Sequence, residues 1–481
     1  MVMRNLIKKN INLEKRRYYG EHLTSIEIFK KFILPYIKEK LYRHTWVDLY
    51  AGEGNLILPI LNYIDKKERI EFFTNRIYLF DIQEEKVKKS VCNAISYGIP
   101  EAVAVKNIIK RDTLKNYPDF INNKDYPVLH ITNPPYLYIG YIVKKGGRNF
   151  TYFKDENKGY QDLYQIALIN DLRNGIKEMI YIIPTNFIYG DSCSNKIRND
   201  LLKFYDIERS FIFEEKIFKY TGTNVGIFFF KKKTKHFTEN IKFHCIKIKN
   251  GVSKNMIYTL KPENNYKAGD YFNEFTRIFK SKKHLSVKFY LNSKELLENK
   301  GTKKLEVIDA NKFIGKNYEI KSIYVNDKLY NKILNNTLFV RTIDTGSEDG
   351  RAGLYEIKDV FNVKGIIVSK PYRTHPIQLF FEPEIGYNDQ INLKKYFNLL
   401  LEYFREQEDS DFLTTFKYSE SSYTRKYLGL NKTKSLIYTF PILEMSNKEK
   451  IDFYKIISKE NSLDIIEFVK SFNKYRGIFN E

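Results

Sequence analysis

The chain has 481 residues, of which 43% are hydrophobic and 16% aromatic, and this is enough apolar material for a large buried core. A wholly disordered chain is therefore excluded, and the length predicts two or three domains. Lys and Arg number 81 against 58 Asp and Glu, and the formal net charge of +23 favours a polyanionic partner, nucleic acid before a membrane surface. A coding bias toward Lys, Asn and Ile is the alternative explanation of this charge.

Cysteine usage and hydropathy bear on the compartment. Cys92, Cys193 and Cys245 cannot form a disulfide framework, and none belongs to a CxxC pair, so we expect neither an oxidising compartment nor a metal site. The first ten residues have no apolar segment of the signal-peptide type, and no run approaches 18 apolar residues. We expect a soluble, cytoplasmic protein without a membrane partner.

The first half of the chain alternates short apolar runs with helix-like stretches. Strands are predicted at 46–50, 77–80, 103–109, 128–132 and 179–184. Helices are predicted between them, at 55–64, 84–96, 161–172 and 195–204. Strands that alternate with helices along the chain require crossover connections. We therefore expect an α/β fold with a Rossmann-like, mostly parallel sheet covered on both faces.

This alternation of strands and helices becomes weaker after about residue 235. The polar run 231–235 indicates a solvated connector, and later strand-like runs are separated by long polar loops, at 338–340, 366–368 and 379–381. The tail is helical, because Ser446 with Glu449 three residues on is a capping-box pattern. We expect two domains, an α/β domain over residues 1–240 and an α+β domain with C-terminal helices over residues 241–481.

The most specific motif is Asn133-Pro134-Pro135-Tyr136, directly after the strand at 128–132. Two successive prolines cannot continue a strand, because both lack an N–H and both fix φ. They end the strand abruptly and hold Asn133 and the carbonyl of Pro134 at the carboxyl edge of the sheet, where open α/β sheets bind ligands. A turn that happens to contain two prolines is the alternative.

A second motif, Asp48-Leu49-Tyr50-Ala51-Gly52-Glu53-Gly54-Asn55, lies between a strand and a helix. Its glycines let the backbone approach a ligand closely. Ile57 stands where the dinucleotide fingerprint has its third glycine, and no phosphate-binding Lys follows the loop. The loop thus suits a nucleoside-like ligand without a pyrophosphate, and a structural tight turn is the alternative.

Two further acids follow strands. Asp81 is placed where a carboxylate can accept two hydrogen bonds from a ribose diol, and Asp112 is similarly placed for an exocyclic amine. Either residue alone is more often a helix cap or a turn residue. With Asp48, they put three acids at three successive strand ends.

In this order, the glycine loop and the later Asn-Pro-Pro-Tyr resemble the S-adenosylmethionine-dependent N6-adenine DNA methyltransferases of the γ arrangement, which belong to restriction–modification or orphan systems. The resemblance covers about residues 16–235 and implies a class I methyltransferase fold over residues 1–240, followed by a target-recognition domain over 241–481. The segment 20–24 departs from the family pattern at His22 and Leu23, as does Ser25 beside it. The resemblance places S-adenosylmethionine against Thr24, Asp48, Tyr50, Ala51, Gly52, Gly54, Asp81, Ile82, Asp112, Thr113 and Asn133.

The chemistry of this family explains the residue types. Adenine N6 is a poor nucleophile because its lone pair is delocalised into the ring. The Asn133 side-chain oxygen and the Pro134 carbonyl can accept its two N–H groups and stabilise the positive charge that develops as the methyl transfers. Neither a metal nor a covalent enzyme intermediate is needed. Because a base inside a duplex cannot reach such a pocket, it is flipped out, and Tyr136 and Phe218 are predicted to stack on it.

Two stretches of the second domain mix cations, hydroxyls and aromatics. The predicted DNA-binding residues are Lys370, Tyr372 and Arg373 in the first stretch and Tyr423, Arg425 and Lys426 in the second. Their cations could reach guanine edges or phosphates, and solvated loops are the alternative. We expect double-stranded DNA as the partner, and a separate cognate restriction endonuclease is a further candidate.

Other functions with related chemistry remain open. An RNA adenine methyltransferase and a protein glutamine methyltransferase use similar Asn-Pro-Pro-Tyr motifs, although a glutamine substrate does not need a large basic region. A combined restriction–methylation enzyme would need a nuclease centre. Glu319-Ile320-Lys321 and Glu356-Ile357-Lys358 have the Glu-x-Lys spacing of a nuclease, but such matches arise by chance in a chain this rich in Glu and Lys.

Overall fold

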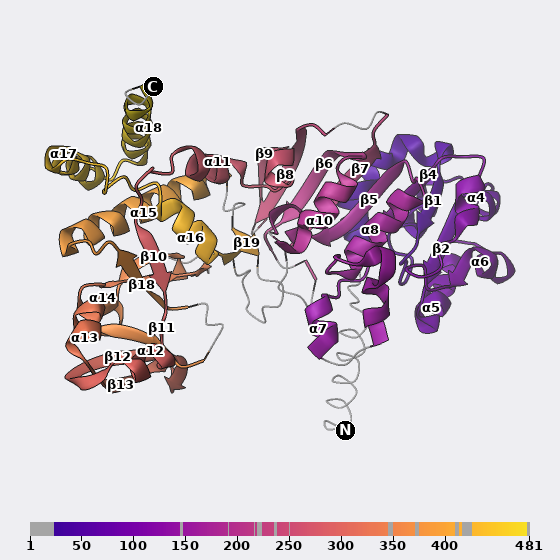
Figure 1. The fold of residues 1–481 in the computed structure, drawn as a ribbon. Coiled ribbons are helices and arrows are strands. Elements are labelled where there is room, and N and C mark those ends of the chain that lie inside the picture. Colours follow the sequence, from indigo (N-terminus) through magenta and orange to yellow (C-terminus); the bar gives the residue numbers. More distant parts are fainter. Residues whose placement is uncertain are drawn as a thin grey trace. The chain divides into compact units, whose positions relative to one another are not determined.

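The structure is a computed structural model, and it describes residues 24–144, 148–190, 192–215, 217–218, 224–234, 238–249, 251–344, 350–370, 375–408, 413–415 and 426–478. The chain has two compact units that meet in the sequence at Ala268 and Gly269 (Figure 1).

The first unit contains a nine-stranded sheet in the order β3-β2-β1-β4-β5-β7-β6-β8-β9. Neighbours from β3 to β5 run parallel, β7 runs antiparallel to both β5 and β6, and β8 is parallel to β6 and antiparallel to β9. The expected Rossmann-like, mostly parallel sheet is therefore confirmed. The strands are β1 (Thr45–Asp48), β2 (Ile77–Asp81), β3 (Ile108–Lys110), β4 (Val128–Thr132), β5 (Glu178–Pro184), β6 (Tyr205–Phe213), β7 (Val225–Lys232), β8 (Ile241–Lys249) and β9 (Val252–Leu260).

Helices connect these strands and pack against the sheet (Figure 1). The longer ones are amphipathic or fully buried, as crossovers covering a sheet must be. The helices before β4 are α2 (Ile26–Ile28), α3 (Leu34–Ile37), α4 (Arg69–Arg76), α5 (Glu84–Ser96) and α6 (Glu101–Asn107). Those after β4 are α7 (Ile139–Lys144), α8 (Leu163–Arg173), α9 (Asn186–Tyr189) and α10 (Ser192–Leu201). Short 3-10 or π turns are η1 (Phe29–Ile33), η2 (Lys38–Arg43), η3 (Leu58–Tyr63), η4 (Asp119–Asn123), η5 (Arg148–Phe153) and η6 (Asp155–Asn157).

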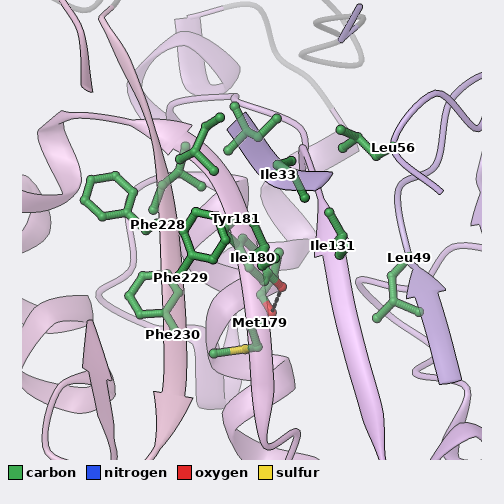
Figure 2. Close-up of a cluster of buried hydrophobic side chains, with 14 of the residues drawn as sticks. Ile33, Leu49, Leu56, Ile131, Met179, Ile180, Tyr181, Phe228, Phe229 and Phe230 are labelled. Carbon is green, nitrogen blue, oxygen red and sulfur yellow. Dashed lines mark hydrogen bonds between the residues drawn. The ribbon is translucent and has the colours of Figure 1, made fainter. Parts of the chain in front are cut away.

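The core of this unit lies on the central strands. Met179, Ile180 and Tyr181 of β5 pair across the sheet with Phe230, Phe229 and Phe228 of β7, as Figure 2 shows. Aromatic and β-branched cross-strand pairs contribute about 0.2–1 kcal/mol each relative to an Ala–Ala pair. The strands that position the candidate site are therefore among the most firmly packed elements of the unit.

Three local predictions differ from the structure. Residues 103–107 belong to helix α6 rather than to a strand, because Pro100 and Glu101 begin a helix and Ala104 packs in the core, whereas Val105 is exposed. The helix predicted over residues 55–64 is instead the shorter 3-10 helix η3, Leu58–Tyr63. The run 231–235 is not a connector throughout, since Lys231 and Lys232 end β7.

The boundary expected at residue 240 also differs from the division at Ala268. The reason is that β8 and β9 extend the large sheet beyond β6. The alternation of buried Ile241, Phe243 and Cys245 with polar residues is the signal of a half-buried strand that could have extended the first domain.

The second unit is a mixture of small sheets and helices. Two four-stranded sheets have the orders β10-β18-β14-β16 and β11-β17-β12-β13, and a three-stranded sheet has the order β15-β20-β19. Its strands are β10 (Ser286–Phe289), β11 (Leu291–Asn292), β12 (Lys300–Ile314), β13 (Asn317–Val325), β14 (Leu338–Arg341), β15 (Ile343–Asp344), β16 (Gly353–Glu356), β17 (Gly365–Val368), β18 (Ile377–Glu382), β19 (Thr414–Thr415) and β20 (Lys426–Tyr427). The expected α+β composition is confirmed.

Helices supply the rest of this unit. They are α11 (Asp270–Ile278), α12 (Ser293–Glu298), α13 (Asp327–Leu334), α14 (Ile357–Phe361), α15 (Tyr387–Glu408), α16 (Leu430–Ile437), α17 (Asn447–Ser458) and α18 (Ser462–Ile478), and the 3-10 turn η7 (Pro262–Asn264) precedes the unit. The capping box predicted for Ser446 and Glu449 is confirmed at the start of α17. None of the helices that the structure describes is long and apolar enough to cross a membrane.

Candidate active site

The glycine turn after β1 is held open by its own backbone geometry. Gly52 and Gly54 have φ of 55° and 81°, in the left-handed region that favours glycine. The Asp48 carboxylate stabilises the turn, because its Oδ1 accepts hydrogen bonds from Tyr50 N at 2.9 Å and from Thr132 Oγ1 at 2.6 Å. Asp48 thereby ties the turn to the end of β4.

Burial makes Asp48 costly to ionise. Asp48 is 1% exposed, and this desolvation raises its pKa from 3.8 to about 6, although the hydrogen bonds from Thr132 Oγ1 and Tyr50 N act in the opposite direction. A carboxylate buried beside a ligand loop and tuned in this way is typical of a functional site.

Asp81 stands at the end of β2 and connects two backbone segments of the site. Its Oδ2 accepts Gly52 N at 2.9 Å and its Oδ1 accepts Gln83 N at 2.8 Å. The carboxylate is thus fixed in direction by the turn on one side and by the start of α5 on the other. A carboxylate has about four lone-pair positions, so it can accept further donors from a ligand.

Asp112 follows β3 and has an aromatic partner from a distant part of the chain. Tyr152 OH donates to Asp112 Oδ2 at 2.8 Å, and Lys115 Nζ lies 4.8 Å from the centre of the Tyr152 ring. The next residue, Thr113, donates through Oγ1 to Leu49 O at 2.7 Å, which joins this strand end to the glycine turn.

The Asn-Pro-Pro-Tyr corner begins directly where β4 ends. Asn133 Nδ2 donates to Thr24 Oγ1 at 2.9 Å, and its Oδ1 accepts a hydrogen bond from Tyr136 OH. Tyr136 OH also contacts Ile182 O of β5 at 2.6 Å, so the amide of Asn133 is oriented by groups on both sides. Asn55 Nδ2 donates to Thr24 O at 2.9 Å and ties Thr24 to the glycine loop as well.

A buried polar network supports the turn from the other face of the strands. Leu49 N donates to His130 Nε2 at 3.2 Å, which requires neutral His130 with its proton on Nδ1, directed at Asp171. Asp171 also accepts Tyr181 OH at 2.6 Å and Tyr117 OH at 2.9 Å. Because every member is satisfied, the network fixes the backbone at Leu49.

The glycine turn, the acids at the ends of β1, β2 and β3 and the Asn-Pro-Pro corner line an open cavity of about 970 Å³, counting the space at its mouth. Its wall contains four carboxylates, those of Asp48, Glu53, Asp81 and Asp112, and two cations, Lys86 and Arg111. Lys86 Nζ pairs with Glu53 Oε1 at 3.2 Å. A wall with this excess of acid suits a cationic nucleoside better than a pyrophosphate.

The cavity brings together most of the residues predicted from the sequence. Those in its wall are Thr24, Asp48, Tyr50, Ala51, Gly52, Asp81, Ile82, Asp112, Thr113, Asn133, Pro134 and Pro135. Gly54 belongs to the glycine turn but not to the cavity wall, and a Cβ added to it would be 2.6 Å from Leu58. Tyr136 and Phe218 are 6% and 4% exposed and are not part of the wall, so stacking of either on a base stays a prediction.

Sequence reasoning missed other residues of the wall. They include Asn55, Gln83, Lys86, Arg111, Leu114, Tyr152 and Leu163. The glycine loop was the only available signal for Asn55, and nothing in the sequence pointed to Tyr152, which lies 40 residues from its partner Asp112. The acids at the strand ends were detectable because a parallel sheet brings its carboxyl ends to one edge.

The predicted DNA-binding residues fall mostly outside the described part of the chain. Tyr372, Arg373, Tyr423 and Arg425 lie outside it. Lys370 is exposed after β17, and Lys426 is half-buried in β20.

The two Glu-x-Lys matches have structural partners. Lys321 Nζ contacts Asp309 Oδ2 at 2.7 Å and Glu319 Oε2 at 3.3 Å, and Glu356 pairs with Lys394 rather than with Lys358. Among the described residues, no group of three or more His, Cys, Asp or Glu could hold a metal ion. Neither match therefore supplies an argument for a nuclease centre.

The sheet order, the reversed β7 and the cavity at the carboxyl ends of β1, β2 and β4 define a class I methyltransferase fold. Residues 5–299, more than half of the chain, match the family model described as N-6 DNA Methylase. The chain belongs to this family, as the resemblance in its motifs implied.

The fold of this chain is also similar to that of solved restriction–modification enzymes. No curated protein matches the chain in sequence. The Type IIL restriction–modification enzyme MmeI, solved in complex with DNA, is 11% identical with a TM-score of 0.50, over 96% of this chain and 76% of that chain.

Modification subunits of type I enzymes give lower TM-scores. The EcoKI M protein is 14% identical over 47% of this chain, with a TM-score of 0.35, and a modification subunit of a putative type I enzyme from Vibrio vulnificus YJ016 is 14% identical over 72%, with a TM-score of 0.36. The chain covers 49% and 61% of these two proteins.

Proposed function

We propose that this chain transfers a methyl group from S-adenosylmethionine to the N6 amine of an adenine flipped out of duplex DNA, within a restriction–modification or orphan methylation system. One observation carries the proposal: Asn133, Pro134 and Pro135 share a cavity with the glycine turn and with the acids at the ends of β2 and β3. The family description agrees with this chemistry.

The wall of the cavity fits the cofactor by its donors and acceptors. Asp81 would accept the ribose hydroxyls, and Asp112, steadied by Tyr152, would accept the adenine amine of the cofactor. Ala51, Ile82, Leu114 and Leu163 supply apolar surface for its ring. When bound, S-adenosylmethionine supplies an electrophilic methyl group on a sulfonium, and the acidic wall favours that positive charge.

The Asn-Pro-Pro corner supplies the acceptors for the substrate amine. Asn133 Oδ1 and the Pro134 carbonyl would each accept one N–H of the target adenine and stabilise the charge that develops on its nitrogen. Thr24 and Tyr136 hold the Asn133 amide in one orientation before the base arrives, which is the preorganisation that such acceptors need.

The second unit is proposed to recognise the DNA target. Support comes from the MmeI likeness, which covers 96% of the chain and so includes this unit. Lys370 and Lys426 remain its proposed DNA contacts among the described residues.

The test is to express the chain in a host that lacks adenine methylation and to sequence the host genome with modification-sensitive detection. We expect N6-methyladenine at one recurring sequence, its loss in Asn133→Ala, and its retention in Asn62→Ala, an exposed amide away from the cavity. Purified protein with labelled cofactor then compares duplex DNA, RNA and host protein as acceptors. Transfer to RNA or protein alone, or full activity in Asn133→Ala, would overturn the proposal.

A further inference from the structure

The hairpin of β12 and β13 in the second unit ends in exposed apolar side chains. Phe313 and Ile314 are 52% and 69% exposed, and Gly315 makes the turn with φ of 62°. Lys312 precedes them and Lys316 follows, so the tip reads Lys-Phe-Ile-Gly-Lys. Exposed apolar side chains that gather at one point of a surface can mark a contact with a partner.

The tip is held rigidly rather than left loose. The Phe313 ring lies 4.6 Å from that of Tyr318, its cross-strand partner, and Tyr318 lies 5.6 Å from Phe361 of α14. This contact fixes one face of Phe313 while half of the side chain stays in solvent. An aromatic side chain fixed in this way loses little entropy when it binds.

The surroundings of the tip carry positive charge. A register shift in β12 between Asp309 and Phe313 bulges the strand, and Asn311 in this bulge accepts Lys370 N at 3.0 Å. The bulge thereby brings the backbone of Lys370 to the base of the tip. The carboxylates of Asp309 and Glu319 lie 2.7 Å and 3.3 Å from Lys321 Nζ, and Glu319 also lies 3.9 Å from Lys312 Nζ. Lys312, Lys316, Lys321 and Lys370 outnumber these two carboxylates, so the surroundings keep a positive charge.

We propose that this hairpin tip, residues 312–316 with Lys370, binds duplex DNA, with Phe313 and Ile314 as an apolar wedge in the minor groove and the lysines on phosphates. Proteins that bend DNA use apolar wedges flanked by cations in this manner. Charge complementarity selects DNA, because a protein partner for two apolar residues would not require the surrounding lysines. The inference rests on the proposed function, which makes duplex DNA the partner.

The test measures the affinity of the full chain for a fluorescein-labelled 30-base-pair duplex pool with a randomised centre, at several salt concentrations. Phe313→Ala with Ile314→Ala should weaken binding about tenfold, near the lower end of what a base-stacking aromatic contributes. The matched control, Leu297→Ala with Ile320→Ala, removes equally exposed apolar side chains of the same unit and should bind as the wild type does. Lys312→Ala, Lys316→Ala and Lys370→Ala together should reduce the slope of log K against log salt by about 0.9 for each of these lysines that neutralises a phosphate.

A second variant keeps the inference testable if the double substitution disturbs folding. The chain has one tryptophan, the buried Trp46, so Phe313→Trp adds an exposed reporter that duplex DNA should quench. Unchanged fluorescence, or equal affinity of the tip variant and its control, would overturn the inference. So would binding to phosphatidylglycerol vesicles, or self-association, that depends on the tip while DNA affinity does not. If methyl transfer is absent while Phe313→Trp is still quenched by DNA, the proposed function fails and the hairpin assignment stands.

Discussion

The hydroxyl of Tyr136 donates a hydrogen bond to the side-chain oxygen of Asn133, three residues earlier, and contacts the carbonyl of Ile182 in the adjacent strand. Tyr136 is buried, and this burial raises the pKa of its phenol well above the usual value, so the hydroxyl keeps its proton. The motif therefore has an internal contact: its last residue orients its first.

Tyr136→Phe tests this positioning role, because it removes the hydroxyl and keeps the ring. The Asn133 amide would then lose one of the groups that orient it, and we expect kcat to fall by about 10- to 100-fold, somewhat less than when a donor to the transition state itself is removed. KM for both substrates should change little. Steady-state methylation kinetics with labelled cofactor provide the measurement.

A matched control for this variant is Tyr164→Phe. The Tyr164 ring lies 6.4 Å from that of Tyr136 and its hydroxyl contacts Ser194 at 3.4 Å, so the change deletes the same atom from a buried tyrosine without touching Asn133. A purely structural role for Tyr136 would lower the stability of both variants and leave their kcat values similar. That result would contradict the positioning role.

Asp48 makes the stability of the first unit depend on pH with a definite sign. Because its pKa is raised to about 6 in the folded chain, the folded state binds a proton more tightly than the unfolded state does. Its contribution to stability is full below pH 4 and is lost as pH rises through 6, by about 3 kcal/mol at 1.36 kcal/mol for each pKa unit. The free energy of unfolding should fall accordingly over this window.

Asp48→Asn isolates this contribution. The asparagine oxygen can still accept from Tyr50 N and Thr132 Oγ1, but the group no longer titrates. We expect the wild type to lose about 3 kcal/mol relative to the variant between pH 3 and pH 7, as measured by denaturant unfolding across that range. Parallel curves for the two proteins would show that Asp48 is not held above its usual pKa.

Much of the site was predictable because short-range rules determine it. Two prolines end β4 at Thr132, where the sequence predicted the end, and α5 spans the predicted residues 84–96. Parallel strands then bring their acidic ends to one edge, which is why Asp81 and Asp112 share a cavity with Asn133.

The parts of the site that could not be predicted from the sequence depend on contacts between distant segments. The hydrogen bonds of Tyr152 with Asp112 and of Asn55 with Thr24 span 40 and 31 residues, and no local periodicity encodes such pairs. Residues 103–107 are predicted as part of a strand, but the alanines and the start at Pro100 favour the helix that the structure has there. Intrinsic strand preference is a weak guide when packing decides the outcome.

Gly54 should be essential for the shape of the turn. It has φ of 81°, and an added Cβ would lie 2.6 Å from Leu58 Cδ1 and 2.8 Å from Ser90 Oγ. Gly98 has a similar φ of 91° and nothing within 4 Å, so Gly98→Ala reports backbone strain alone. We expect Gly54→Ala to destabilise the protein by about 1–3 kcal/mol more than Gly98→Ala, measured by denaturant unfolding. Equal losses would mean that the site accommodates the methyl group.

Asp81 should matter for cofactor affinity more than for the rate of methyl transfer. Its carboxylate is fixed by Gly52 N and Gln83 N, and a hydrogen bond to a charged group contributes about 1.5–3 kcal/mol. We therefore expect Asp81→Ala to weaken the binding of S-adenosylhomocysteine by roughly 10- to 150-fold in isothermal titration. The control is Glu84→Gln, which removes an exposed carboxylate that is outside the cavity wall, and it should bind as the wild type does. If Asp81→Ala bound equally well, the carboxylate would serve only to hold the turn, and the ribose would have to lie elsewhere in the cavity.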